Sequence, residues 1–531
     1  MQELIYELVE YGIQNGLIPE EDITYRVNVL AEFFDVSDFT TSFWEYEAQR
    51  NGIPANLSPD EMNKPGAGAP AVIKRRTIGE ILGEICDLAV KNGIIKEDTV
   101  TNRDLFDTKV MGLITPAPSV VRKKFDELYA ESPEAATKWY YDFSISTNYI
   151  RKDRIVRDEK WATDTAYGPI DISINLAKPE KDPKAIAAAG AAKKSGYPAC
   201  LLCKENEGYA GHLTHPARQN HRIIPVTLGG EQYYLQYSPY VYYNEHCIVF
   251  NEKHIPMVIN RAVFTKLFDF IDCFPHYTVG SNADLPIVGG SILSHDHFQG
   301  GNYTFAMAKA DYEETFELKK YPHIKAGIIK WPMSVIRLQG EDRTQIEEAS
   351  YEILQKWRGY SDESAGIRSF SVSENDGPRI LHNTITPIAR MRGDLYEIDL
   401  VLRNNRTDKE HPWGIFHPTA DLHHIKKENI GLIEVMGLAI LPARLKTELA
   451  ELEKRILDGS DLRGSELTAK HADWAEEWRG AYPDLSRENI HGVVQNEVGK
   501  VFAKVLECAG VYKRDEKGRA AFCRFIKSLD E

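Results

Sequence analysis

The chain has 531 residues, of which 43% are hydrophobic and 27% charged, and its formal net charge is −15. This length predicts about two to four structural units, and the acidic balance argues against general nucleic-acid binding but not against a small phosphorylated substrate. The sequence has no run of about 20 apolar residues and does not begin like a signal peptide, so we expect no membrane association and a cytoplasmic location.

Helices are predicted for the first ~140 residues. Apolar residues recur at helical spacing from Leu4 to Ile13 and stop at Asn15-Gly16, a favourable helix end. A related segment leads from Ile81 to Asn92-Gly93, 77 positions later. The repeat predicts two copies of a helical hairpin. Because no candidate catalytic cluster falls in it, we interpret this region as a docking or interface unit.

Short aromatic and β-branched runs then predict strands, and the pattern becomes helical again after residue ~425. The expected strands are 170–175, 233–237, 247–250, 326–330, 380–387 and 396–402, and the expected late helices are 431–451 and 489–510. The fold class is therefore α+β with helical ends. The expected domains are a helical region 1–145, α+β regions 146–320 and 321–428, and a helical region 429–531.

The stretch GGSILSHDHFQGG, residues 289–301, places His295, His297 and Gln299 at alternating positions. In a strand these side chains would project to one face. A neutral imidazole is a competent nucleophile toward phosphorus, and an amide can donate to phosphoryl oxygens. The His-x-His pair alone would also fit a structural or metal-binding role. The flanking glycine pairs favour phosphate chemistry, because they let the backbone approach a ligand closely.

Of the seven cysteines, only Cys200 and Cys203 have a spacing that indicates chemistry. The Cys-x-x-Cys spacing supplies half of the ligands of a zinc site, and the surrounding residues fit a metal site better than a redox pair. A third interpretation is that both cysteines are simply buried. The missing ligands are expected downstream. His254, at the end of an expected strand, and His295 would complete a Cys2His2 zinc site.

Two further groups of residues are less specific. Arg218 and Arg222 could hold a phosphate bidentately, and a solvated salt-bridging role fits them equally well. A polar, proline-containing segment carries several histidines, which we interpret mostly as surface or capping residues: His411, His417, His423 and His424.

Several motifs together resemble the bacterial class II galactose-1-phosphate uridylyltransferases, also called UTP–hexose-1-phosphate uridylyltransferases. The two most specific are SHDHFQGG, 294–301, and YPACLLCKENEGY, 197–209. Further similar segments are GPIDISINLAKPEKDP, 168–183, HRIIP, 221–225, HPT, 417–419, and GLIEVMGLA, 431–439. The likeness runs over the whole chain.

The resemblance implies a histidine-triad fold with two related α+β halves built on antiparallel sheets. It implies that His297 attacks the α-phosphorus of UDP-glucose and releases glucose 1-phosphate, after which galactose 1-phosphate takes up the uridylyl group. It assigns Gln299 to the phosphoryl oxygens. It also assigns zinc to the same set that the spacing gives, Cys200, Cys203, His254 and His295, with no organic cofactor.

The sequence departs from the class I members of this family at two places. Their proline between the two histidines is Asp296 here, a carboxylate that could raise the pKa of both imidazoles. Their second metal site includes a late His-x-His, whereas this chain reads Tyr-Glu-Ile-Asp over 396–399, so we do not expect that site in its class I form.

The expected partners are the small molecules UDP-glucose and galactose 1-phosphate. The residues expected to bind them are Asn282, Gly290, Ser291, Arg222 and Tyr237. The helical ends either form a homodimer interface or pack on the core. Two other functions stay open: a dinucleotide phosphorylase or hydrolase of the same superfamily, and a zinc-stabilised binding protein without catalysis.

Overall fold

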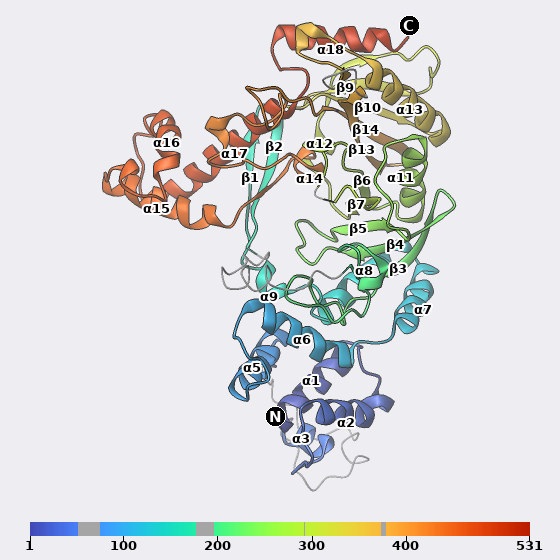
Figure 1. The fold of residues 1–531 in the computed structure, drawn as a ribbon, viewed down its shortest axis with the longest axis vertical. Helices are drawn as coiled ribbons and strands as arrows, with labels where there is room; N and C mark the ends of the chain where they lie inside the picture. The colour runs from blue at the N-terminus through green and yellow to red at the C-terminus, as the bar shows by residue number, and fades with distance from the viewer. Residues whose placement is uncertain (51–74, 177–195, 291, 373–378, 531) are drawn as a thin grey trace. The chain divides into compact units, whose positions relative to one another are not determined.

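The structure is a computed structural model that describes residues 1–50, 75–176, 196–290, 292–372 and 379–530 (Figure 1). The chain forms two compact units, one of residues 1–153 with 179–224 and the other of residues 154–178 with 225–531. None of the described helices is long and apolar enough to cross a membrane.

The described residues up to 153 in the first unit are mostly helical, as the sequence predicts. Its helices are α1 (Gln2–Gln14), α2 (Ile23–Phe33), α3 (Phe43–Arg50), α5 (Ile78–Lys91), α6 (Val100–Ile114), α7 (Pro118–Tyr129) and α8 (Pro133–Ser146), with α9 (Lys152–Ile155) at the boundary of the units. Thr77 begins α5 with a capping box, in which its hydroxyl accepts from the Glu80 N–H and the Glu80 carboxylate accepts from the Thr77 N–H.

The two segments of the predicted repeat have similar local structure. Both α1 and α5 end at an Asn-Gly pair, and the two glycines have φ values of +66° (Gly16) and +73° (Gly93), which favour glycine. The residue two positions beyond each glycine donates its N–H back into the helix, Ile18 to Gly12 and Ile95 to Ala89. Each copy then continues into a second helix, α2 or α6, which packs on the first.

The Cys-x-x-Cys loop belongs to the first unit, whereas the sequence placed it in the 146–320 region. The reason is a set of contacts that the loop makes with the helices. Glu207 pairs with Arg122 of α7 at 2.7 Å, and the Asn220 side chain donates to the carbonyl of Thr147 at 2.8 Å. Neither partner could be read from local sequence.

The second unit is built on a ten-stranded sheet. Its strands are β3 (Ile224–Leu228), β4 (Glu231–Tyr237), β5 (Cys247–Asn251), β6 (Thr278–Gly280), β7 (His297–Gly301), β8 (Tyr312–Phe316), β9 (Lys325–Ile329), β10 (Val335–Gly340), β13 (Asn383–Arg392) and β14 (Leu395–Asn404). Their order is β3-β4-β5-β7-β6-β13-β14-β10-β9-β8. The α+β class with two antiparallel halves is therefore confirmed, and the halves join into one sheet where β6 pairs with β13.

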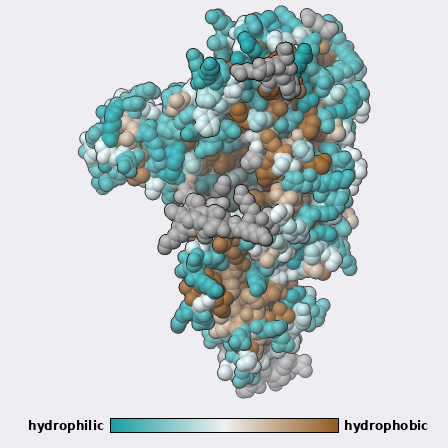
Figure 2. All heavy atoms as spheres, viewed as in Figure 1, coloured by the Kyte–Doolittle hydropathy of each residue, from teal (hydrophilic) through white to brown (hydrophobic). Residues whose placement is uncertain are grey.

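Helices α11 (Arg261–Cys273) and α13 (Arg343–Gly359) pack on one face of this sheet (Figure 1). On the other side, one apolar cluster includes residues from the sheet, from β2 and from α17, such as Val401, Ile172 and Phe502. The remaining elements of the second unit are β1 (Glu159–Thr165), β2 (Gly168–Ile174), α12 (Ala306–Lys309), β11 (Phe370–Val372), β12 (Arg379–Leu381), α14 (Leu432–Val435), β15 (Leu438–Leu441), α15 (Arg444–Asp458), α16 (Ala472–Arg479), α17 (Ile490–Ala509) and α18 (Glu516–Ser528). Figure 2 shows hydrophilic side chains over most of the projection formed by α15 and α16.

Two predicted elements are wrong in detail. The single helix expected over 431–451 is divided into α14, β15 and α15, because Gly437 adopts φ +93° and Pro442 interrupts the chain before α15. β15 then pairs in parallel with β2. The strand expected over 380–387 breaks at His382, whose side chain bonds to Asn405 and Ser371, and so belongs to two strands, β12 and β13.

Candidate active site

His297 is the first residue of β7, a central strand that pairs with β5 and β6. Its side chain is buried, with 5% exposure, and its Nδ1 lies 2.8 Å from the carbonyl oxygen of His295. Because a carbonyl only accepts, Nδ1 carries the proton and the lone pair lies on Nε2. This is the tautomer that a nucleophile needs.

Burial lowers the pKa of His297, and the hydrogen bond to the His295 carbonyl and the nearby Asp296 only partly oppose this. Asp296 points elsewhere. Its carboxylate accepts from the Tyr233 hydroxyl and lies 3.9 Å from Lys266 Nζ. The carboxylate that replaces proline in the motif is therefore engaged with other side chains, and the pKa of His297 stays below its usual value because burial outweighs the charge of Asp296.

Gln299 lies two residues further along β7, so its side chain is on the same face as that of His297. Gly280 of β6 stands directly opposite Gln299. A Cβ on Gly280 would come within 2.9 Å of Leu432, so this face of the sheet is the one on which α14 packs. Only glycine fits at this position, because Leu432 and Ile388 already occupy the place of a side chain.

The segment before the histidines brings two predicted binding residues together. Asn282 accepts from the N–H of Leu432 at 3.0 Å, and a Cβ on Gly290 would approach the Asn282 amide to 2.7 Å, so only glycine fits there. Between them, Ile287 has φ +75°, a strained value for a β-branched residue that often marks functional loops. Ser291 lies outside the described residues.

The structure gives no support to the other two predicted binding residues. Tyr237 is fully buried, and its hydroxyl bonds to that of Tyr277 at 2.9 Å. The Arg222 guanidinium, 7% exposed, donates within the first unit to the backbone carbonyls of Thr115, Pro116, Gln219 and His221. Strand and charge patterns cannot tell inward from outward side chains in these buried segments.

Cys200 and Cys203 are one pair of candidate metal ligands. In the first unit the Sγ atoms of Cys200 and Cys203 lie 3.6 Å apart. This fits the separation of about 3.8 Å for two thiolates on one tetrahedral ion with metal–sulfur bonds of about 2.3 Å. The N–H of Leu202 donates to Cys200 Sγ, and the Asn206 side chain donates to the carbonyls of both cysteines.

In the second unit the rings of His254 and His295 have centroids 4.8 Å apart. His295 is fully buried and donates from Nε2 to the Asn251 carbonyl at 2.8 Å, which leaves the Nδ1 lone pair for an ion. The two cysteines and two histidines are, among the described residues, a group that could hold a metal ion. These are the four residues that the spacing predicts as metal ligands, and their role stays a prediction.

Two family models cover most of the chain. Galactose-1-phosphate uridyl transferase, N-terminal domain, matches residues 73–256, and the C-terminal domain of the same family matches residues 270–476. The chain belongs to the galactose-1-phosphate uridylyltransferase family. Members of this family transfer nucleotidyl groups, so the chain is an enzyme of the nucleotidyltransferase class.

Curated relatives of this galactose-1-phosphate uridylyltransferase family are similar along their whole length. The protein named galactose-1-phosphate uridylyltransferase from Halalkalibacterium halodurans is 52% identical, over 99% of this chain and 98% of its own. Those from Clostridium acetobutylicum and Bacillus subtilis are 49% and 48% identical over 99% of this chain, and 99% and 97% of their own. Among solved structures, yeast Ap4A phosphorylase Apa2 aligns with a TM-score of 0.29 and 13% identity, over 62% of this chain and 96% of its own.

Where class I members of the galactose-1-phosphate uridylyltransferase family carry their second metal site, this chain has buried ion pairs. Asp399 of β14 accepts from Arg337 at 2.7 and 3.0 Å and from Arg390 at 2.6 Å. Glu397 pairs with Arg390 and with Arg392. Both carboxylates are at most 1% exposed and are neutralised by arginines.

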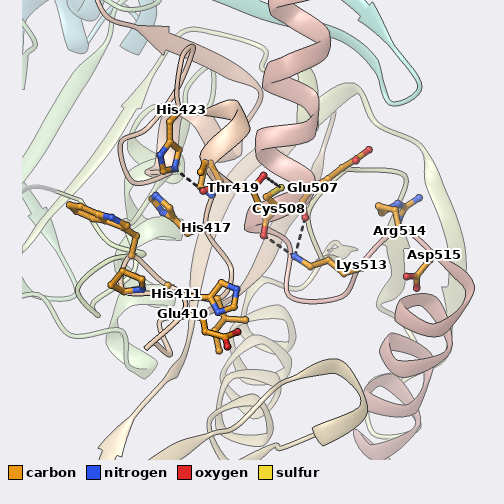
Figure 3. A pocket seen from close by; sticks show the side chains of 16 residues that line it. Glu410, His411, His417, Thr419, His423, Glu507, Cys508, Lys513, Arg514 and Asp515 are labelled. Carbon is orange, nitrogen blue, oxygen red and sulfur yellow. Dashed lines mark hydrogen bonds between the residues drawn. The ribbon is translucent and has the colours of Figure 1, made fainter. Parts of the chain in front are cut away.

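A cavity of about 800 Å³ lies elsewhere in the second unit, between the loop 410–423 and residues 507–515 (Figure 3). His417 and His423 face it, and each bonds through Nε2 to a backbone carbonyl, of Lys427 and Pro418. Lys513 donates to carbonyls at the end of α17. His417 and His424 are both buried, the second against His471, so neither has the surface position expected for most of these histidines.

Sequence reasoning missed one residue of the site, His246. It directly precedes β5 and its Nε2 lies 3.3 Å from the Gln299 side-chain oxygen. The only sequence signal is its place beside an expected strand. The register that sets it near Gln299 comes from the pairing of β5 with β7, which no local pattern reveals.

Proposed function

We propose that this enzyme exchanges a uridylyl group between UDP-glucose and galactose 1-phosphate by a ping-pong mechanism with a covalent intermediate on His297. The observation that carries the proposal is the bond from His297 Nδ1 to the His295 carbonyl, which leaves Nε2 as the nucleophilic atom. The relatives named galactose-1-phosphate uridylyltransferase supply the substrate class.

In the first half-reaction, His297 Nε2 forms a bond to the α-phosphorus of UDP-glucose. The bond from that phosphorus to the bridging oxygen breaks, and glucose 1-phosphate leaves with the electron pair. The imidazole becomes positively charged as it attacks, and the His295 carbonyl, which accepts from Nδ1, stabilises that charge. The Gln299 amide donates to the phosphoryl oxygens, on which negative charge grows.

In the second half-reaction, a phosphate oxygen of galactose 1-phosphate attacks the same phosphorus. The phosphorus–nitrogen bond breaks, UDP-galactose is formed, and His297 returns to its neutral form. Asn282 and Gly290 lie on the loop that leads into the histidines, and we assign them to binding the nucleotide phosphates.

We further propose zinc as the ion held by Cys200, Cys203, His254 and His295. Two thiolates and two imidazoles are the donor set of structural zinc, with all four positions filled by protein. The homodimer and the cytoplasmic location stay predictions.

The test is incubation of the protein with labelled UDP-glucose in the absence of an acceptor. A transferase yields about one acid-labile uridylyl group per chain that survives gel filtration and moves to added galactose 1-phosphate. Steady release of free UMP would instead identify a hydrolase. His297→Asn removes the label and the exchange of hexose phosphates while leaving the thermal unfolding midpoint unchanged within about 2 °C.

A matched control is His276→Asn, since His276 lies outside the site. That variant keeps the label. A His297→Asn protein that still exchanges hexose phosphates at the wild-type rate would mean that the nucleophile is wrongly assigned.

A further inference from the structure

His246 contacts the proposed phosphate-binding amide and is otherwise enclosed. Its Nε2 lies 3.3 Å from Gln299 Oε1, and the residue is 2% exposed. The rings of Tyr242 and Tyr243 lie against the imidazole, with centroids 5.4 and 4.5 Å away. The two uncharged tyrosine rings therefore hold the imidazole in place.

The surroundings of Nδ1 decide the tautomer of His246. This atom is buried and has no hydrogen-bond partner in the part of the chain that the structure describes, so a proton on it would be an unsatisfied buried donor. The proton therefore lies on Nε2, which donates to Gln299 Oε1. Burial lowers the pKa of His246 to about 4, so the ring is neutral at neutral pH.

The neutral N–H donor of His246 also determines the orientation of the Gln299 side-chain amide. With Oε1 bonded to His246, the NH2 group is at the other end of the amide and can donate to a phosphoryl oxygen. The opposite rotamer would present Oε1 to the phosphoryl group, and two acceptors would repel each other. We propose that His246 is a positioning residue that holds the Gln299 amide with its NH2 group toward the transferred phosphoryl group. This inference rests on the proposed function.

The backbone next to His246 shows that its position is enforced. Glu245 has φ +52°, a strained value for a residue other than glycine that persists only where the surroundings impose it. They do so here, because the Glu245 carboxylate accepts from the buried Tyr277 hydroxyl. Glu245 lies in the turn before β5, where its side chain is bound to Tyr277 while that of the next residue, His246, reaches Gln299.

The test is a double-mutant cycle read by the rate constant for uridylylation of the protein by UDP-glucose in a single turnover. His246→Phe keeps a ring between the tyrosines but removes the donor, and we expect a slowing of about 10- to 100-fold. His246→Gln places an amide N–H where Nε2 was, and we expect it to stay within about 3-fold of wild type. In a Gln299→Ala background, His246→Phe should cause no further loss, because the residue acts through Gln299.

A purely structural role would give a different pattern. His246→Phe would then slow the reaction by the same factor with or without Gln299, or His246→Gln would be as slow as His246→Phe, and either result overturns the inference. If His246→Phe does not fold, His246→Asn replaces it, since its shorter amide cannot reach Gln299 and it should be slow while His246→Gln is not. Wild-type protein that forms no uridylyl adduct would refute the proposed function instead.

Discussion

The buried ion pairs around Asp399 predict a large loss of stability when a single charge is removed. Asp399 is fully buried and bonds to two arginines that are 2% and 6% exposed, Arg337 and Arg390. Asp399→Asn keeps the shape of the side chain but leaves both guanidinium groups facing Glu397 alone. Breaking a buried pair in this way costs about 3–5 kcal/mol. At about 2 °C per kcal/mol for a unit of this size, the thermal midpoint should fall by about 6–10 °C.

The assay is thermal unfolding followed by circular dichroism, with Glu313→Gln as the matched control. Glu313 pairs bidentately with Arg514, but both side chains are partly exposed, at 30% and 19%. Removing that charge should cost at most about 1 kcal/mol, or about 2 °C. If Asp399→Asn shifts the midpoint no more than Glu313→Gln, the reasoning that this cluster is a buried structural unit is wrong.

Three further predictions concern the metal, pH and one glycine. Cys200→Ser should lower both the zinc content, about one ion per chain in wild type, and the thermal midpoint, and unchanged zinc would refute the site. Burial lowers the pKa of His246 to about 4 and that of His424 to about 3, so each is neutral when folded but takes up a proton when unfolded below about pH 6.5. The free energy of unfolding should therefore be constant above about pH 6.5 and fall by about 2 kcal/mol per histidine by about pH 5. In His424→Gln this fall should be smaller by about 2 kcal/mol. A fall as large as that of the wild type would contradict the lowered pKa of His424. Gly437→Ala should destabilise by at least about 1–2 kcal/mol in urea unfolding, because φ is +93° and the new Cβ would lie 2.7 Å from Trp331; an unchanged midpoint would mean that the chain relaxes there.

Those parts of the fold that depend on local pattern could be predicted from the sequence. The helix ends at Gly16 and Gly93 and the strands β4, β5, β9 and β14 follow from spacing and residue type. The division of 431–451 could not, because its β15 exists only through pairing with β2, more than 250 residues earlier. The single sheet across both halves likewise depends on β6 meeting β13, a contact between distant segments.

Some residues of the candidate site can likewise be predicted from local sequence, and others depend on tertiary packing. His297 and Gln299 share a face because they are two apart in a strand, and the Cys-x-x-Cys spacing indicates a metal before any fold is known. Tyr237 and His246 show the limit, since both lie beside β5 and only the tertiary packing turns the first into the interior and the second toward Gln299. The contacts of the Asp296 carboxylate could also be found only from the structure, because its partners Tyr233 and Lys266 are distant in the sequence.

The central claim is that Nε2 of His297 carries the transferred uridylyl group. The most direct measurement is the mass of the intact protein after brief exposure to UDP-glucose, followed by digestion and localisation of the adduct. We expect a mass increase of one uridylyl group, on the peptide containing His297, that disappears when galactose 1-phosphate is added. An unmodified protein that still exchanges the hexose phosphates, or an adduct on a peptide without His297, would contradict it.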